Sequence, residues 1–407
     1  MNLRVLSILG TRPEAVKMAP VILQLAKTKG IESTVCVTAQ HRQMLDQVLD
    51  LFDITPDVDL NLMSPDQSLT TISSEIFSHL DPVIKKVDPH WVLVQGDTTT
   101  VMVASILTYY NQIKLGHIEA GLRTGDKNRP FPEEINRRIT SLIADLHFAP
   151  TQWARMNLIQ EGISSDIVLV TGNPVIDAIQ SAAEIPAPDD LSELLNQLRI
   201  KDGSSPETKL PHENIQRRLI LVTAHRRENF GEPLVEICNA IRILAEKYSD
   251  SVTFLYPVHP NPNVSEPVYR MMGDIPNVTL IPPLDYLPFI HLLKRAAIVL
   301  TDSGGLQEEA PGFGIPVLVM REVTERPEGI EAGTVKLVGT DCEIIVAETS
   351  RLLDNPSAYD SMAQATNPYG DGHASERIVE GLINFVRSAE NTEKKVHNKN
   401  AKIKPLK

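Results

Sequence analysis

Cysteine is scarce in this sequence, and the three that occur (Cys36, Cys238 and Cys342) lie far apart, with no C-x-x-C pair. This spacing excludes a disulfide framework and a cysteine-based zinc site, and it fits a reducing compartment, so we expect a cytoplasmic protein. No stretch approaches the roughly 18 apolar residues of a transmembrane helix, so no membrane partner is expected. The short apolar run in the first ten residues has no cleavage site after it and is more typical of a strand than of a signal peptide.

Positive charge is in deficit, with 39 Lys and Arg against 52 Asp and Glu and a net charge of −13. An acidic chain has no general attraction for a polyphosphate backbone, so nucleic acid is not expected as a partner. Lysine is concentrated only in residues 391–407, which we predict to be a disordered, solubilising tail. The length of 407 residues, 42% of them hydrophobic, predicts a globular protein of two or three domains.

The common cofactor and nucleophile motifs are also missing. The sequence has no G-x-x-x-x-G-K-[ST] and no G-x-G-x-x-G after its first apolar run, which argues against a P-loop enzyme and weakens a nicotinamide or flavin site. The absence of H-E-x-x-H and G-x-S-x-G removes the simplest zinc-protease and esterase interpretations. We therefore expect neither a cofactor nor a metal.

What is present is a repeated alternation of apolar runs and amphipathic segments. Continuous apolar strands separated by helices indicate an α/β fold with parallel sheets covered on both faces. A proline-rich stretch, 181–217, interrupts the pattern and is predicted to be a linker between two doubly wound, Rossmann-like domains, 1–180 and 218–372, that face a cleft. The expected strands of the two halves are 4–9, 34–38, 91–95, 115–119, 146–149 and 167–170, then 219–223, 252–257, 278–281, 297–301 and 316–319.

Polar residues follow the strands of the first half, where open α/β sheets bind their ligands. Arg12 and Lys17 lie beside a helix start that suits an anion. Asp97, Glu119 and Glu133 follow neighbouring strands, and grouped carboxylates are candidates for proton transfer. Taken singly, Asp97 is equally compatible with a helix cap and Glu133 with a partner of the helix dipole.

In the second half, the run Ser303-Gly304-Gly305 follows a strand and opens a helix, so backbone N–H groups can approach a diphosphate there. Glu309, one turn later, can accept hydrogen bonds from ribose hydroxyls. His225 and Arg226 follow another strand and suit a phosphate group, although a plain basic surface loop is an alternative. His259 lies in a proline-rich loop that is equally compatible with a structural role. These residues predict a nucleoside-diphosphate site.

A set of longer motifs resembles one family closely: the non-hydrolysing bacterial UDP-N-acetylglucosamine 2-epimerases. The resemblance runs from about Leu3 to Arg387. It implies the two-Rossmann architecture of B-type glycosyltransferases, a homodimer, and interconversion of UDP-GlcNAc and UDP-ManNAc for surface polysaccharide synthesis. A helix at about 373–388 is then expected to return to the first domain. The motifs are GTRPEAVKMAP, TAQHRQMLD, QGDTTT, HIEAGLRTGD, FPEEINR, TAHRREN, YPVHPNPNV, LTDSGGLQEEAP and ERPEG.

The resemblance also implies roles for individual residues. The acid/base carboxylates are Asp97, Glu119 and Glu133, and His225 contacts the leaving phosphate. Substrate is further bound by Arg12, Lys17, Phe289, Ser303, Gly304, Gly305, Glu309 and Arg326, with Phe289 beside the uracil. An activating UDP-GlcNAc site corresponds to Gln40, Gln43, Arg226 and His259, although some members carry a basic residue where this chain has Asp66.

The implied mechanism is elimination. The C2 proton and the C1–O bond break to leave 2-acetamidoglucal and UDP, which then recombine with the proton on the opposite face. Three alternatives stay open: a glycosyltransferase of the same architecture, a hydrolysing epimerase that releases free ManNAc and UDP, and a non-catalytic sugar-nucleotide sensor.

Overall fold

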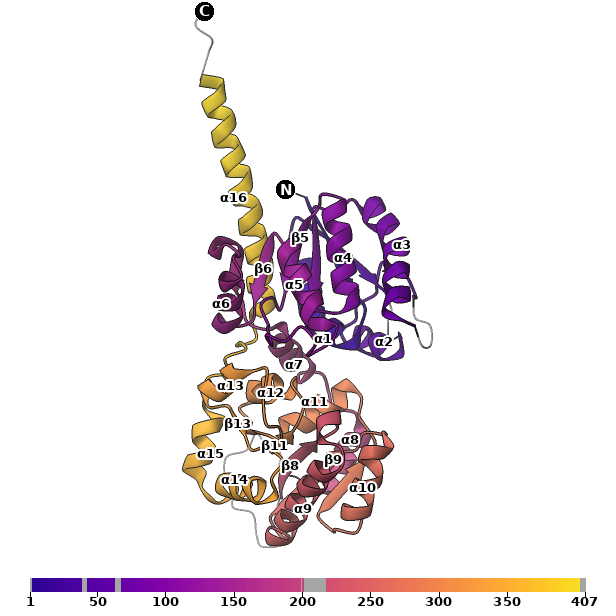
Figure 1. Ribbon diagram of the computed structural model, residues 1–407, viewed down its shortest axis with the longest axis vertical. Coiled ribbons are helices and arrows are strands. Elements are labelled where there is room, and N and C mark those ends of the chain that lie inside the picture. Colours follow the sequence, from indigo (N-terminus) through magenta and orange to yellow (C-terminus); the bar gives the residue numbers. More distant parts are fainter. Residues whose placement is uncertain (1, 39–41, 63–66, 199, 201–216, 403–407) are drawn as a thin grey trace, which may run out of the picture. The chain divides into compact units, whose positions relative to one another are not determined.

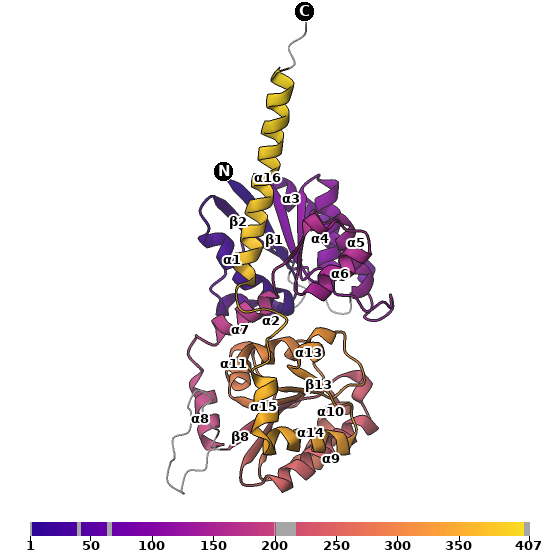
Figure 2. The ribbon, with the colours of Figure 1, turned by 90° about the vertical axis from the view of Figure 1, so that its left-hand side faces the viewer.

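The computed structural model describes residues 2–38, 42–62, 67–198, 200 and 217–402, with the backbone alone described for 42–44, 197 and 389–402. The chain divides into two compact units. Unit 1 comprises Met1–Ala178 and Gly372–Lys407, and unit 2 comprises Ile179–Asp371. In both views of the ribbon each unit is a twisted sheet with helices packed on both faces (Figures 1 and 2).

The sheet of unit 1 has seven described strands in the order β3-β2-β1-β4-β5-β6-β7, all paired in parallel. The strand order reverses between β1 and β4, so the carboxyl ends of these two strands lie side by side at the edge where such sheets bind ligands. The strands are β1 (Leu3–Leu9), β2 (Ile31–Val37), β3 (Val58–Asp59), β4 (Trp91–Gln95), β5 (Lys114–Ile118), β6 (Leu146–Ala149) and β7 (Val168–Val170).

Helices cover both faces of this sheet. On one face, α3 and α4 bury an apolar cluster against β1, β4 and β5 that includes Ile8, Ile76 and Val94. On the other face, α16 packs against the sheet, where the rings of Trp91 and Phe385 meet edge to face, 5.4 Å apart. The helices are α1 (Arg12–Lys27), α2 (Arg42–Leu51), α3 (Leu69–Val87), α4 (Thr99–Tyr110), α5 (Glu133–Ile143), α6 (Gln152–Gln160), α7 (Pro174–Ala182) and α16 (Ala374–Lys402).

Unit 2 repeats the pattern with six described strands in the order β10-β9-β8-β11-β12-β13, again parallel. Its strands are β8 (Arg218–Thr223), β9 (Val252–Pro257), β10 (Val278–Ile281), β11 (Ala296–Thr301), β12 (Val317–Val319) and β13 (Val335–Leu337). Its helices are α8 (Asp189–Gln197), α9 (Glu232–Lys247), α10 (Pro262–Met272), α11 (Tyr286–Lys294), α12 (Leu306–Glu309), α13 (Pro327–Ala332), α14 (Cys342–Asp354) and α15 (Pro356–Ala363).

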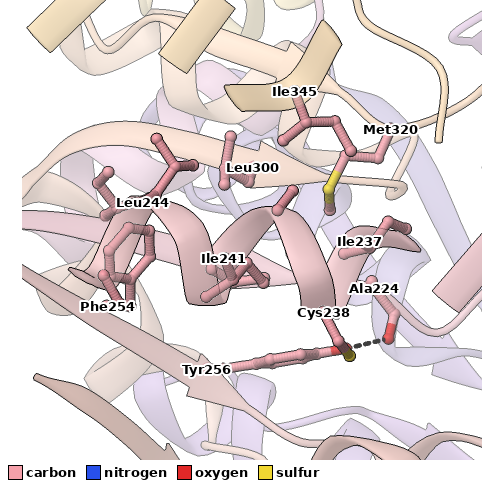
Figure 3. Packing of buried hydrophobic residues seen from close by; sticks show 14 of the residues in the cluster. Ala224, Ile237, Cys238, Ile241, Leu244, Phe254, Tyr256, Leu300, Met320 and Ile345 are labelled. Atoms are coloured by element: carbon pink, nitrogen blue, oxygen red, sulfur yellow. Dashed lines mark hydrogen bonds between the residues drawn. The ribbon is translucent and has the colours of Figure 1, made fainter. Parts of the chain in front are cut away.

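The core of unit 2 forms where α9 lies across the sheet. Ile237, Ile241 and Leu244 recur at intervals of three and four residues on α9 and are fully buried, as an amphipathic helix requires. They pack beside Phe254 of β9 (Figure 3). In the same cluster the Tyr256 hydroxyl donates a hydrogen bond of 2.6 Å to the carbonyl oxygen of Ala224. This bond ties the end of β8 to the core.

The predicted α/β class with two doubly wound parallel sheets is confirmed. Two short strands, β3 and β13, were not predicted, because β3 has only two residues and β13 carries Lys336 at its centre, so neither contains a continuous apolar run. Helix α16 extends to Lys402, where composition predicts a disordered tail. No helix among the described residues is long and apolar enough to cross a bilayer.

Candidate active site

The turn after β1 is built around a buried carboxylate, Glu14. Its Oε2 accepts hydrogen bonds from the backbone N–H groups of Gly10 and Thr11, both at 2.7 Å, and its Oε1 accepts one of 2.5 Å from the Thr98 hydroxyl. Burial raises the pKa of Glu14, and these donors act in the opposite direction. A Cβ on Gly10 would lie 2.4 Å from the Thr38 hydroxyl, so only glycine fits this turn. Through its hydrogen bonds to Gly10, Thr11 and Thr98, Glu14 joins the turn that follows β1 to the turn that follows β4.

Arg12 and Lys17 both lie on α1, which this turn begins. Arg12 is the first residue of the helix and is half-buried. Lys17 lies five residues later, and its Nζ is 2.5 Å from Oε1 of Glu119. The structure therefore brings Lys17 against a predicted catalytic carboxylate, beyond the anion-binding role expected from the first turn alone.

Glu119, directly after β5, is held from three sides. Lys17 and the Asn173 amide (2.8 Å) donate to its Oε1, and the Gln95 amide (2.5 Å) donates to its Oε2. Its φ of 62° lies in the left-handed region, which residues other than glycine seldom adopt. Such a conformation persists only where the surroundings determine it, and it is frequent at functional sites. These three side chains fix the position of the Glu119 carboxylate.

Asp97 lies in the turn after β4. Its Oδ2 is 2.5 Å from the Arg137 guanidinium, and Asn136 donates to its backbone carbonyl at 2.9 Å. Burial raises the pKa of Asp97, although Arg137 acts in the opposite direction. The N-cap of α4 is Thr98, whose side chain accepts from Val101, so Asp97 is not occupied with capping.

Glu133 and Glu134 begin α5 and have different surroundings. Glu134 is fully buried and accepts hydrogen bonds from Thr124 and Arg138, which gives it a structural role in this loop. The Oε2 atom of Glu133 is buried without a hydrogen-bond partner among the described residues. A carboxylate oxygen in this state is available to a ligand.

Two histidines lie beneath these carboxylates on β5 and β6. His117 is buried, and its Nε2 lies 2.8 Å from the Gly96 carbonyl oxygen, next to Asp97. His147 is its neighbour across the strand pair and is equally buried, and neither of its ring nitrogens has a hydrogen-bond partner in the part of the chain that is described. Burial lowers the pKa of His117 to about 3 and that of His147 to about 4. Both imidazoles are therefore neutral at pH 7.

The depressed pKa of His147 predicts a loss of stability in acid. An unfolded histidine titrates near 6.5, so below that pH the unfolded chain binds a proton that the native chain does not, and the free energy of unfolding falls. We expect His147→Leu to lessen this fall by about 2–3 kcal/mol at pH 4.5, measured by urea unfolding at pH 7.5 and 4.5. His79→Leu, on the exposed surface of α3, is the control. Parallel pH profiles for wild type and His147→Leu would contradict the assignment.

In unit 2, His225 and Asp302 meet at the carboxyl ends of β8 and β11. Oδ2 of the fully buried Asp302 accepts hydrogen bonds from the backbone N–H groups of His225 and Arg226, both 2.8 Å, and from Asn229 at 3.1 Å. The rings of His225 and His259 stack with centroids 5.4 Å apart. Burial lowers the pKa of His225, against the effect of Asp302. The His225 side chain is 42% exposed, so it can reach a ligand.

The Ser-Gly-Gly turn follows β11. A Cβ on Gly304 would lie 2.6 Å from Nη1 of Arg326, so this glycine lets the guanidinium approach the backbone. Arg326 is held by Glu308 and Glu325. Oε1 of Glu309 lies over Gly305, 3.4 Å from where a Cβ would stand. The structure thus gathers five of the predicted nucleotide-binding residues at one strand end: Ser303, Gly304, Gly305, Glu309 and Arg326.

The remaining predicted residues are less closely grouped. Phe289 is half-buried on α11, Arg226 is half-buried, and His259 is exposed beside His225. Gln40 and Asp66 lie outside the described residues, and Gln43 is described by its backbone alone on α2. No group of three His, Cys, Asp or Glu side chains placed to hold a metal occurs within the described parts of the chain.

Comparison with known proteins decides the family. A family model described as UDP-N-acetylglucosamine 2-epimerase matches residues 23–383. The chain belongs to the UDP-N-acetylglucosamine 2-epimerase family. This membership makes it an isomerase of the carbohydrate-epimerase class, as the motifs predict.

Individual members of the UDP-N-acetylglucosamine 2-epimerase family resemble the chain over nearly its whole length. The Escherichia coli K12 enzyme of that name is 50% identical over 382 residues, which are 94% of this chain and 99% of the relative. The Bacillus subtilis enzyme is 50% identical over 383 residues, 94% and 95% of the two chains. A crystal structure of the Neisseria meningitidis enzyme bound to UDP-GlcNAc is 48% identical, with a TM-score of 0.81 over 94% of this chain and 100% of the other.

Several residues around the site were not predicted from the sequence. Gln95, Asn173 and Asp302 place Glu119 and His225, and no spacing rule links them to their partners. Glu14 did carry a signal, because Thr11-x-x-Glu14 is the pattern of a capping box and both of its hydrogen bonds are present.

Proposed function

We propose that the chain interconverts UDP-GlcNAc and UDP-ManNAc by eliminating and re-adding UDP, without a metal or nicotinamide cofactor. The observation that carries the proposal is the group formed by Lys17, Asp97 and Glu119 at neighbouring strand ends of unit 1, with Glu133 on the following helix. Unit 2 supplies residues suited to a nucleoside diphosphate.

The chemistry explains why several carboxylates are needed. The C2 proton of the sugar has no neighbouring carbonyl group to acidify it, so removal of the proton alone is unfavourable. If the C1–O bond to UDP breaks as the proton leaves, the electron pair of the C2–H bond forms the C1=C2 double bond of 2-acetamidoglucal. UDP carries away the electrons of the C1–O bond. Re-addition of UDP at C1, with a proton delivered to the other face of C2, completes epimerisation.

The surroundings of the carboxylates suit the two proton transfers, one that removes the proton from C2 and one that delivers a proton to the other face. Three side chains donate hydrogen bonds to Glu119 and hold it in place, whereas burial raises the pKa of Asp97. A carboxyl group with a raised pKa is suited to deliver a proton, and a carboxylate held in place beside the reacting atom is suited to receive one. Glu133 offers a buried oxygen that other described residues leave unsatisfied. We propose that Asp97, Glu119 and Glu133 exchange the proton at C2.

The nucleotide half stabilises the leaving group. His225 and Arg326 place positive or polar groups near the ends of β8 and β11, where the phosphates of UDP are proposed to bind together with Ser303 and Gly304. Glu309 then receives the ribose hydroxyls, and Phe289 lies against the uracil. Arg12, the first residue of α1 in unit 1, is proposed as a further substrate-binding cation. Hydrogen-bond donors that are already in place before the reaction stabilise the negative charge that develops on UDP, and so lower the free energy of the transition state.

A direct assay tests the proposed reaction. Purified protein incubated with UDP-GlcNAc alone is expected to form UDP-ManNAc as the minor component of an equilibrium mixture. Anion-exchange chromatography separates the two nucleotide sugars and measures their ratio. Stoichiometric release of ManNAc and UDP would indicate a hydrolysing epimerase instead. Transfer of the sugar to an added acceptor would indicate a glycosyltransferase, and binding without conversion would indicate a sensor.

We also propose that the protein acts as a homodimer. The side chains of Tyr109, Tyr110 and Leu142 lie at the ends of the neighbouring helices α4 and α5, and Leu142 is 82% exposed. Exposed apolar side chains on adjoining elements are typical of interaction surfaces. Light scattering is expected to give twice the chain mass, and Leu142→Asp is expected to lower it. A monomeric wild type would contradict this assignment.

Two further roles complete the proposal. UDP-GlcNAc is also proposed to act as an activator, for which the family resemblance implies the residues Gln40, Gln43, Arg226 and His259. The stacking of His259 on His225 supports this role, because it places a candidate activator residue against a candidate catalytic one. The product supplies ManNAc units for cell-surface polysaccharide.

A further inference from the structure

The three donors that hold Glu119 come from different parts of unit 1. Lys17 is on α1, Gln95 ends β4, and Asn173 lies in the turn between β7 and α7, 54 residues after Glu119. Lys17 and Gln95 are near Glu119 because β1, β4 and β5 are neighbouring strands. Asn173 instead follows β7, which is separated from β5 by β6. Its side chain therefore connects Glu119 to the β7 edge of the sheet.

The orientation of the Asn173 amide is fixed by its own contacts. Its Oδ1 accepts a hydrogen bond of 3.1 Å from the backbone N–H of Val175 at the start of α7. Since the oxygen is used in this way, the NH₂ group must point to Glu119, where it donates at 2.8 Å. Asn173 is only 1% exposed, so water does not compete for either bond.

Helix α7 is itself anchored at the place where the chain passes between the units. The chain leaves unit 1 within α7, after Ala178, and re-enters it at Gly372. Asp177 of α7 accepts hydrogen bonds from the backbone N–H groups of Ala374 and Ser375, at 3.1 and 2.8 Å, and from the Ser375 hydroxyl at 2.6 Å. These bonds tie the outgoing and returning segments of the chain together. Asn173 immediately precedes this helix and is bonded to its first turn, so the anchoring of α7 through Asp177 also holds Asn173 in place.

We propose that Asn173 is a positioning residue for the epimerisation, which sets the direction of the Glu119 carboxylate by donating to its Oε1. The inference rests on the proposed function of Glu119. Glu119 has a left-handed backbone conformation and a flexible side chain, so its direction depends on the donors around it. The Asn173 amide is an uncharged donor, whereas Lys17 is a cation. The amide also approaches Glu119 from the turn before α7, a direction that the Lys17 side chain on α1 does not supply.

Two substitutions separate this role from helix capping. Serine caps helices as well as asparagine but is too short to reach Glu119, so Asn173→Ser keeps the cap of α7 and removes the donor. Asn173→Asp also keeps the cap and places a second carboxylate against Glu119. The matched control is Asn355→Ser, because Asn355 caps α15 through an equivalent bond of 3.1 Å to Ala358.

The measurement is steady-state epimerisation together with calorimetric UDP binding and thermal melting. We expect kcat to fall on the order of 10-fold in Asn173→Ser and 10²-fold in Asn173→Asp, while KM and UDP affinity stay within about twofold, since misplacement of a catalytic group acts on kcat. Asn355→Ser is expected to retain wild-type kcat. Wild-type kcat in both Asn173 variants, or parallel losses of UDP affinity and melting temperature, would overturn the inference. Failure of the proposed function is distinct, because then the wild type itself forms no UDP-ManNAc.

Discussion

Replacing Glu119 by glutamine is expected to lower turnover by on the order of 10²-fold or more, the usual scale for loss of a general acid or base. The substitution keeps the shape of the side chain. A glutamine oxygen can still accept from Lys17 and Asn173, and its NH₂ group can donate to Gln95 if that amide turns over. The fold is therefore expected to tolerate the change while the group that titrates is lost.

UDP binding and thermal melting distinguish catalysis from structure in this variant. Calorimetric affinity for UDP should change little, because the nucleotide site is attributed to residues of unit 2. Glu75→Gln, on the exposed face of α3, is the surface control and should behave as wild type. If Glu119 only satisfied buried donors, its replacement would instead lower the melting temperature and impair binding and turnover together. Undiminished exchange of the C2 proton in a well-folded Glu119→Gln protein would remove Glu119 from the mechanism.

His225→Ala is expected to weaken UDP binding as well as turnover. A hydrogen bond to a charged group contributes about 1.5–3 kcal/mol, so the loss of one phosphate contact predicts a decrease in affinity on the order of 10- to 10²-fold. The backbone of the turn should survive, since Asp302 accepts from the N–H groups of residues 225 and 226 whatever the side chain is. Calorimetric titration with UDP measures the effect.

The control for this variant is His79→Ala, which removes an exposed histidine from unit 1. It should leave both UDP affinity and turnover unchanged. A His225→Ala protein that binds UDP with wild-type affinity would show that the phosphates lie elsewhere. The pair Glu119→Gln and His225→Ala therefore separates proton transfer from nucleotide binding, which the proposed function assigns to different units.

The architecture could be predicted because its strands are long, apolar and separated by amphipathic helices. The first strand of each unit, β1 and β8, is nearly all apolar, and both were predicted to within one residue of their observed bounds. Strand β13, in which Lys336 separates Val335 from Leu337, has no such apolar run. Asp97, Glu119 and His225 lie within two residues of a strand end, a position that is general for ligand-binding residues of open α/β sheets and needs no knowledge of side-chain contacts.

The residues that support the site could not be predicted, for a physical reason. Asn173 contacts Glu119 and Asp302 contacts His225 across 54 and 77 positions of sequence, and such pairings depend on how strands are ordered in the sheet. Asp97 was compatible with a helix cap until the structure assigned that role to Thr98. The left-handed backbone of Glu119 likewise depends on its surroundings and is not encoded by local propensity.

Epimerisation by elimination and re-addition can be followed by NMR of UDP-GlcNAc incubated with the enzyme in deuterated water. Elimination and re-addition exchange the C2 proton with the solvent, because one face loses a proton and the other receives a deuteron from a different carboxyl group. We expect deuterium at C2 of UDP-ManNAc and, as the reaction reverses, of UDP-GlcNAc, with no accumulation of free ManNAc. UDP-ManNAc that retains the original proton at C2 would contradict it.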